Sequence, residues 1–334
     1  MHIFIDESGS FATGPSGNSL SLVGALIVPD HKLEKLFGKY GRIRIGLRKD
    51  RGEVKGKLLC EPEVARIVEL ARKNNCVFEA VAIDMGLESV EGLKKHRLRQ
   101  AESLTRHLTK EHQPALIAGV HDLRARLEKM SLPLYVQSQL TFQLLGNIIQ
   151  VLPAYWTLRA PRETLIYHWV VDGKGVDRVT NAEDWWSTTM LGLMQSRSFN
   201  KPMVFPDWVD SGPFNTKFRI TMPEYLQGHL PGVEDGIDLK LLMKESFRFS
   251  SDPEPGLELV DIVTNATRRA LMGNLGREGW LGIPQLMIHT AKDQYLKMVT
   301  LTIAGPGPRR PYAKLLATDF RRNGRSLLTP SNYA

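Results

Sequence analysis

Three aspartates lie in strongly apolar surroundings. Asp6 ends the apolar segment 2–6, Asp172 ends the segment 164–172, and Asp261 interrupts the apolar segment 257–263. Burying an isolated carboxylate costs free energy unless the group is paired or bound to a metal ion. Carboxylates that share one site repel one another, which raises their pKa values and favours binding of a divalent cation. Asp6, Asp172 and Asp261 are therefore candidate ligands of Mg²⁺ or Mn²⁺.

The chemistry of such a cluster is hydrolysis of phosphate esters. Two divalent ions about 4 Å apart can activate a water molecule and stabilise the leaving oxygen of a phosphodiester. Each aspartate also has a simpler interpretation. Asp6 and Asp172 each precede turn-forming residues, and Asp261 could pair with Arg268 or Arg269, one to two helical turns later. The metal hypothesis therefore requires that the fold bring the three side chains together.

The elements that must position these residues follow from hydrophobic periodicity and from the Gly, Pro and Asn residues at their ends. The sequence predicts strands at 2–6, 20–28, 77–84, 164–172, 202–206, 217–222 and 246–251, and helices at 31–40, 61–74, 87–112, 133–151, 183–196 and 257–272. A hairpin extended by a third strand and followed by alternating helices and strands indicates an α/β domain with a mixed β-sheet. If the strands ending in Asp6 and Asp172 are neighbours, both acids meet at one edge of the sheet.

The charge of the chain is concentrated in one segment. The 334 residues carry a formal net charge of +8, and 42% hydrophobic residues are enough for a sizeable core. From Asp30 to Lys57 there are ten Lys or Arg and four acids, a local net charge of +6. Such a region attracts polyanions by counterion release, which makes nucleic acid the expected partner. A solvated helix face is the simpler alternative.

Other features exclude several classes of protein. Cys60 and Cys76 form no metal-binding pair, which argues against a zinc site and indicates reduced thiols in the cytoplasm. We expect neither a signal peptide nor a membrane span. Among the histidines, His107, His112 and His168 form no convincing ligand set. Nucleophile-elbow, P-loop and dinucleotide-binding motifs are absent.

Several motifs, taken in order, resemble one known family. They are Ile3-Phe4-Ile5-Asp6-Glu7-Ser8-Gly9, Leu22-Val23-Gly24-Ala25-Leu26-Ile27-Val28-Pro29, Glu53-Val54-Lys55-Gly56-Lys57, Val170-Val171-Asp172-Gly173-Lys174, and Ser250 followed by Pro255-Gly256-Leu257-Glu258-Leu259-Val260-Asp261-Ile262-Val263. This set is similar to a widespread bacterial and phage family, the domain of unknown function numbered thirty-eight hundred. The chain departs from the family pattern at Ser10, Glu258 and Val260, where Asp, Gln and Ala are usual.

The resemblance implies a ribonuclease H-like fold over residues 1–275, with insertions at about 30–75 and 176–245 and a C-terminal extension at 276–334. It implies that Asp6, Asp172 and Asp261 ligate the metal, with Glu7 as a weaker candidate because strand alternation places it opposite Asp6. Lys55 and Lys57, and also Lys174, would neutralise phosphate charge, and Ser8 and Gly9 would shape the turn. Asn265, one turn after Asp261, could touch the site. Such sites normally use four acids, and Glu7, Glu53 and Glu258 are the candidates for the fourth.

Three functions are compatible with these residues. The first is a metal-dependent nuclease acting on RNA or DNA, in a defence or mobile-element context, as a homodimer or with a partner protein. The second is a nucleic-acid-binding adaptor with a degenerate site, and the third is a metal-dependent phosphoesterase acting on a small nucleotide. Trp185 and Trp186 could stack on bases, although packing is the simpler role for such a pair.

Overall fold

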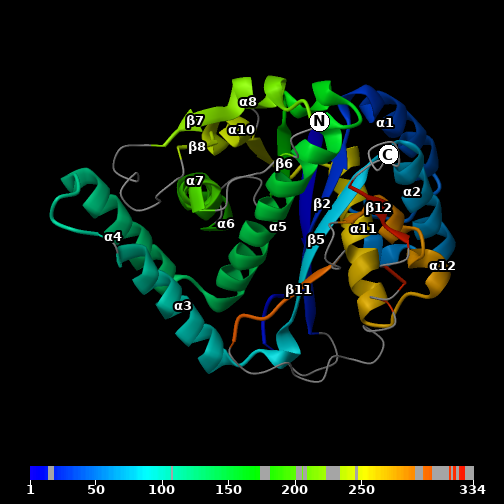
Figure 1. Ribbon diagram of the computed structural model, residues 1–334. Helices are drawn as coiled ribbons and strands as arrows, with labels where there is room; N and C mark the ends of the chain where they lie inside the picture. Colours follow the sequence, from blue (N-terminus) through cyan, green and yellow to red (C-terminus); the bar gives the residue numbers. More distant parts are fainter. Residues whose placement is uncertain are drawn as a thin grey trace.

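A six-stranded mixed sheet forms the centre of the molecule in the computed structural model (Figure 1), with strand order β11-β5-β2-β1-β6-β9. The structure describes residues 1–13, 19–106, 108–173, 181–200, 205, 209–222, 234–244, 247–289, 296–302, 316, 319–320 and 323–327. The strands are β1 (His2–Ser8), β2 (Leu20–Val28), β5 (Val77–Asp84), β6 (His168–Asp172), β9 (Phe247–Ser250) and β11 (Lys297–Val299). Strand β2 is antiparallel to β1 and β5, whereas β6 runs parallel to β1 and β9 parallel to β6. The predicted mixed α/β sheet is confirmed.

Helices cover both faces of this sheet (Figure 1). The α-helices are α1 (Asp30–Arg44), α2 (Glu61–Lys73), α3 (Val90–Thr105), α4 (Pro114–Lys129), α5 (Leu132–Thr157), α6 (Asn181–Trp185), α7 (Leu191–Asn200), α8 (Gly212–Phe218), α10 (Leu239–Lys244), α11 (Pro255–Leu271) and α12 (Arg277–Trp280). The buried hydrophobic residues form two cores, one on each face of the sheet. One core contains residues of α11, α1, α2 and α12, and the second contains residues of α5. None of the described helices is long and apolar enough to span a membrane.

Short ladders and single helical turns complete the described structure. The ladders are β3 (Lys49–Asp50) with β4 (Glu53–Val54), β7 (Arg219–Thr221) with β8 (Asp235–Ile237), and β10 (Ile288–His289) with β12 (Arg325–Ser326). The turns are Gly56–Leu58, Met85–Leu87, Pro161–Thr164, Trp186–Met190 and Ile283–Leu286. The β3–β4 ladder and the turn at Gly56–Leu58 bring the basic segment next to α11.

Strand alternation determines which side chains face each helical layer. In β1, Ile3 and Ile5 belong to the core that contains α5, and Phe4 belongs to the core that contains α11. In β6, Val171 belongs to the core that contains α5, and Val170 belongs to the core that contains α11. Because successive side chains in a strand point to opposite faces, the even-numbered residues of both strands lie on the α11 side.

Some elements differ from the prediction. Strands β2 and β5 have the predicted bounds, but β6 begins at His168 rather than 164, and β1 extends to Ser8. The predicted helix 87–112 is shorter, and a further helix, α4, follows it. Together α3 and α4 form a hairpin that projects from the body of the molecule (Figure 1). The predicted strand at 202–206 lies outside the described residues except for residue 205.

Candidate metal centre formed by three aspartates

The first two aspartates occupy neighbouring positions on adjacent parallel strands. Ile5 of β1 pairs with Val171 of β6, so the next residues along the two strands are Asp6 and Asp172. Both acids fall on the α11 face by strand alternation. Helix α11, which carries Asp261, packs directly on β1 and β2. The structure thus brings together the three aspartates that the sequence singled out.

Two glycines let α11 approach the sheet this closely. Gly24 of β2 pairs with Asp6, and a Cβ at Gly24 would lie 2.2 Å from Oγ1 of Thr264 in α11. At the start of α11, a Cβ at Gly256 would lie 2.2 Å from the ring of Phe4. Any larger residue at either position would push the helix away from the sheet. These contacts set the distance between Asp261 and the strand acids.

The three carboxyl groups strongly influence one another. Burial, followed by the charges of Glu7, Asp261 and Asp172, raises the pKa of Asp6 well above its ordinary value. Burial and the charge of Glu7 raise the pKa of Asp172 to about 6. Burial also raises the pKa of Asp261, although a hydrogen bond from Gly56 and the charge of Lys55 act in the opposite direction. The cluster therefore retains protons that isolated aspartates would lose.

Asp261 is held by the backbone and not by the arginines that follow it. The N–H of Gly56 donates a 2.6 Å hydrogen bond to Oδ2 of Asp261. Arg268 donates instead to the carbonyl of Leu20 (2.6 Å), and Arg269 to the carbonyls of Gly56 (3.2 Å) and Leu59 (2.9 Å). In the part of the chain that the structure describes, Asp261 therefore does not form the ion pair with Arg268 or Arg269 that was its simpler interpretation.

The two candidate phosphate-binding lysines have different positions. Nζ of Lys55 lies 2.7 Å from Oε2 of Glu53, and its positive charge lowers the pKa of both Asp172 and Asp261. The side chain of Lys57 is 64% exposed, and its Nζ lies 3.8 Å from Asp50. Lys55 is thus beside the acidic cluster, and Lys57 lies on the surface. Lys174 lies outside the described residues.

The three candidates for a fourth acid, Glu258, Glu7 and Glu53, also have different surroundings. Glu258 is fully buried and accepts hydrogen bonds from Tyr40 Oη (2.8 Å), Arg44 Nε (2.6 Å), Arg44 Nη2 (2.7 Å) and the N–H of Val54 (2.9 Å). These contacts give Glu258 a structural role that ties α11 to α1 and β4. Strand alternation assigns Glu7 to the face of β1 opposite Asp6, yet the charge of Glu7 raises the pKa of both Asp6 and Asp172. Glu53 raises the pKa of Asp172 and Asp261 from the β3–β4 ladder.

Asn265 adds an unsatisfied polar atom on the same helix. Its Nδ2 donates to Oγ of Ser8 at 3.3 Å, whereas its Oδ1 is buried and has no hydrogen-bond donor in the described structure. A buried amide oxygen without a donor is costly, and such an oxygen is a suitable ligand for a hard cation or a bound water. The donor chemistry around Asp261 therefore fits Mg²⁺ or Mn²⁺.

The side chains do not form a single compact three-ligand site. Among the described residues, one group of three has ligand atoms that all lie within 4.8 Å of one another, and it is His2, Asp30 and His168. The three aspartates do not meet this distance. A pair of ions sharing the acids would not require all three carboxylates on the same ion.

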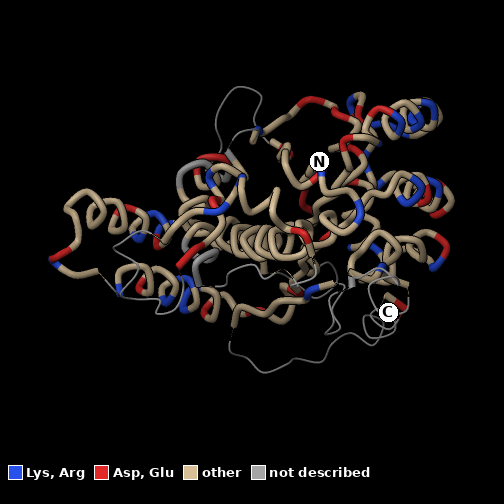
Figure 2. Tube along the Cα trace, turned by 45° about the horizontal axis from the view of Figure 1, so that its top comes forward, with Lys and Arg blue, Asp and Glu red and all other residues tan. Residues whose placement is uncertain are grey.

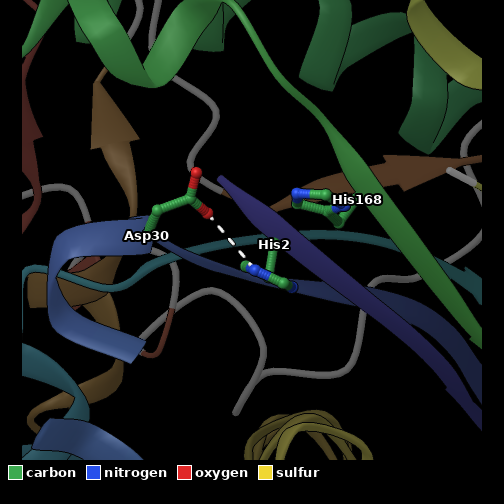
Figure 3. Close-up of side chains that lie close together, drawn as sticks. All are labelled: His2, Asp30 and His168. Carbon is green, nitrogen blue, oxygen red and sulfur yellow. Dashed lines mark ion pairs between the residues drawn. The ribbon is translucent and has the colours of Figure 1, made fainter. Parts of the chain in front are cut away.

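His2 lies with His168 and Asp30 in one group of possible metal ligands, and this proximity is not among the predictions from the sequence. His2 pairs with His168 across β1 and β6, and Oδ1 of Asp30 lies 3.3 Å from Nε2 of His2 (Figure 3). Burial, then the neighbouring His168, lowers the pKa of His2 to about 4. The sequence held a usable signal, because His2 and His168 each precede a predicted site aspartate by four residues. Strands that align Asp6 with Asp172 must also align these histidines.

The aromatic and basic candidates have largely structural surroundings. Trp185 and Trp186 are buried, and Trp186 stacks on Phe247 with ring centroids 5.3 Å apart, so this pair packs in the core. Within the basic segment, Arg44 is committed to Glu258. Figure 2 shows that Lys and Arg positions are interspersed with Asp and Glu positions along the chain. Exposed basic residues remain on α1 and the following ladder, namely Lys35, Lys39, Arg42, Arg48, Lys49 and Arg51.

Comparisons with protein-family models, curated proteins and solved structures give no match for this chain.

Proposed function

We propose that this protein is a divalent-metal-dependent nuclease with a ribonuclease H-like domain, and that Asp6, Asp172 and Asp261 hold its metal ions. The convergence of these three acids, of which Asp6 is buried and Asp172 and Asp261 are half-buried, on one face of the sheet is the observation that carries the proposal. The β1–β2 hairpin is extended by β5 beside β2 and by the parallel strands β6 and β9 beside β1. This strand order supports the expected fold.

The residues around the acids have separate roles in this proposal. When bound, Mg²⁺ or Mn²⁺ would supply charge to activate water and to stabilise the leaving oxygen of a phosphodiester. Asp6 and Asp172 would give up their protons on metal binding, because the metal charge replaces the mutual repulsion that raises their pKa values. Lys55 would hold a phosphate as a point charge beside Asp172 and Asp261. Gly56 and Asn265 would keep Asp261 and its surroundings in place.

The basic segment favours a polymeric substrate. Exposed lysines and arginines on α1 and the β3–β4 ladder lie on the same side of the sheet as Lys55 and α11. A chain of phosphates bound at the acidic cluster could extend toward these residues. RNA or DNA is therefore the substrate class we expect.

The test is cleavage of fluorescently labelled single-stranded and duplex RNA and DNA by the untagged chain in Mg²⁺ or Mn²⁺. We expect activity that EDTA abolishes and that Asp6→Asn, Asp172→Asn and Asp261→Asn each reduce by at least about 100-fold, since removing one catalytic metal ligand costs several kcal/mol. Asp122→Asn is the matched control, because Asp122 is 63% exposed on the distant helix α4.

Equal cleavage by all four variants would contradict the proposal and point to a contaminating nuclease. Salt-dependent binding without metal-dependent turnover would favour an adaptor function. Turnover of mononucleotide esters without cleavage of either polymer would favour a small-nucleotide phosphoesterase.

A further inference from the structure

A second group of ligands lies at the other end of β1 and β6. His2 and His168 pair across the two parallel strands, with ring centroids 4.4 Å apart and ring planes 23° apart (Figure 3). Asp30, the first residue of α1, places Oδ1 at 3.3 Å from Nε2 of His2. The ligand atoms of all three residues lie within 4.8 Å of one another. Three different elements thus meet at this point.

The surroundings hold Asp30 in place and leave the group accessible. Glu163, nearly fully buried, accepts a 2.8 Å hydrogen bond from the N–H of Asp30 and contacts Nδ1 of His31 at 2.7 Å. The amino group of Met1 lies 3.1 Å from Oδ1 of Asp30. The side chains of His2 and Asp30 are 24% and 43% exposed, so an ion could reach them from solvent. The candidate ligands are thus partly exposed, whereas Glu163, which holds the backbone of Asp30, is buried.

The donor types determine which ion fits. Two imidazole nitrogens and one carboxylate suit Zn²⁺ and related transition metals, and such a set leaves a coordination position for water. Mg²⁺ prefers oxygen ligands and is a poor match for two imidazoles. The stacked rings need a rotation about the Cβ–Cγ bond before both nitrogens can face one ion, and this torsion is soft. No such donor set is present in the acidic cluster.

We propose that His2, His168 and Asp30 form a binding site for a transition-metal ion of the Zn²⁺ type. The ion would join the starts of β1, β6 and α1. It would be separate from the acidic cluster, because four residues of extended strand span about 13 Å. The site has no part in the proposed nuclease reaction, so the two proposals can fail independently.

The test is a Zn²⁺ titration of the untagged chain against a chromophoric chelator. We expect one Zn²⁺ per chain, and at least about 100-fold weaker binding in His2→Asn and in His168→Asn, since loss of even a supporting residue costs 10- to 100-fold. His112→Asn is the matched control, because His112 is partly exposed and its side chain hydrogen-bonds only with Thr109 within the described structure. Asp172→Asn should retain full zinc binding.

A measurement on the unaltered chain removes any dependence on how the variants fold. Cu²⁺ bound in place of Zn²⁺ should give an electron paramagnetic resonance spectrum with hyperfine coupling to two imidazole nitrogens. Zinc binding that is unchanged in folded His168→Asn would overturn the proposal. So would coupling to fewer than two nitrogens, or loss of zinc in Asp172→Asn with retention in His168→Asn.

Discussion

The backbone N–H of Gly56 donates a 2.6 Å hydrogen bond to Oδ2 of Asp261, and so links the basic segment to the acidic cluster. A Cβ at Gly56 would lie 2.8 Å from Cα of Ile262 and 2.9 Å from Cβ of Asn265. The atoms that it would meet belong to or adjoin the backbone of α11 and cannot move aside cheaply. Only glycine permits the loop to approach the helix at this point.

We therefore predict that Gly56→Ala lowers the free energy of unfolding by about 2 kcal/mol, the usual cost of overpacking a close contact. It should also weaken metal binding by the acidic cluster, because the loop must shift away from Asp261. Urea denaturation monitored by circular dichroism measures the first effect, and isothermal titration with Mn²⁺ measures the second.

Gly38→Ala is the control for that variant. A Cβ at Gly38 meets nothing within 4 Å, and the residue lies inside α1. Alanine should stabilise the helix by about 0.5 to 1 kcal/mol. Equal effects of the two substitutions would show that Gly56 has no special contact with α11.

Glu258 is predicted to be essential for stability and not for catalysis. Burial raises its pKa, but hydrogen bonds from Arg44 and Val54 outweigh this and leave the pKa below its ordinary value of 4.5. Glu258→Gln should lose about 2 to 4 kcal/mol near neutral pH, because Arg44 keeps its charge without a partner. Since this depressed pKa stabilises the fold only above the ordinary value, the difference from the unaltered chain should shrink below pH 4.5.

Thermal unfolding from pH 3 to pH 8 measures this difference. Glu34→Gln, at an exposed position on the same helix as Arg44, should change stability by less than about 0.5 kcal/mol. If Glu258→Gln is as stable as Glu34→Gln at pH 7, the ion pair contributes nothing to the fold.

Residue type and strand parity were enough to predict much of the acidic cluster. Apolar strands ending in Asp6 and Asp172 required only that β1 and β6 be neighbours, and the pairing of Ile5 with Val171 satisfies this. The same argument assigns Glu7 to the opposite face, and this stays a prediction because the charge of Glu7 acts on both Asp6 and Asp172. What the sequence could not give was the approach of the segment around Gly56 to α11, because that contact depends on packing between elements about 200 residues apart.

The end of α5 and the group of His2, His168 and Asp30 show two different limits of prediction from the sequence. The sequence predicts a helix at 133–151, just before Pro153, yet α5 contains Pro153 and continues to Thr157. Burial of Leu152, Tyr155 and Trp156 offsets the hydrogen bond that proline removes. The pairing of His2 with His168 followed from the same register as the aspartates, but it becomes visible only when both ends of the strands are considered.

Lys55 and Lys57 allow a lysine beside the acidic cluster to be compared with a lysine on the surface. Lys55→Gln should reduce kcat/KM on a nucleic-acid substrate by about 10-fold or more, because its charge acts next to Asp172 and Asp261. Lys57→Gln should change it by less than about threefold, since a highly exposed side chain is screened by solvent and salt.

Steady-state cleavage at two salt concentrations measures both effects. The loss in Lys55→Gln should persist at high salt, because its surroundings are partly buried. Equal losses in the two variants would mean that both lysines contribute only general attraction for the polyanion.

The raised pKa values of the acidic cluster predict an unusual dependence of stability on pH. The folded chain binds protons at Asp6, Asp172 and Asp261 more tightly than the unfolded chain does. Through these groups, the free energy of unfolding of the metal-free chain should therefore fall as pH rises from about 4 through about 6. Asp172→Asn removes one of the repelling charges. It should be more stable than the unaltered chain at pH 8 by about 1 to 2 kcal/mol, after allowance for solvent screening.

At pH 4 this advantage should disappear, because Asp172 is then protonated in the folded chain and resembles asparagine. Saturating Mg²⁺ should reverse the order at pH 8, since it stabilises the unaltered chain by binding only the folded state, whereas the variant has lost a ligand. Thermal unfolding at pH 4 and pH 8, with Mg²⁺ or EDTA, separates these effects, and Asp122→Asn should follow the unaltered chain throughout. A variant that is less stable than the unaltered chain in EDTA at pH 8 would mean that Asp172 is held by compensating contacts and not by repulsion awaiting a cation.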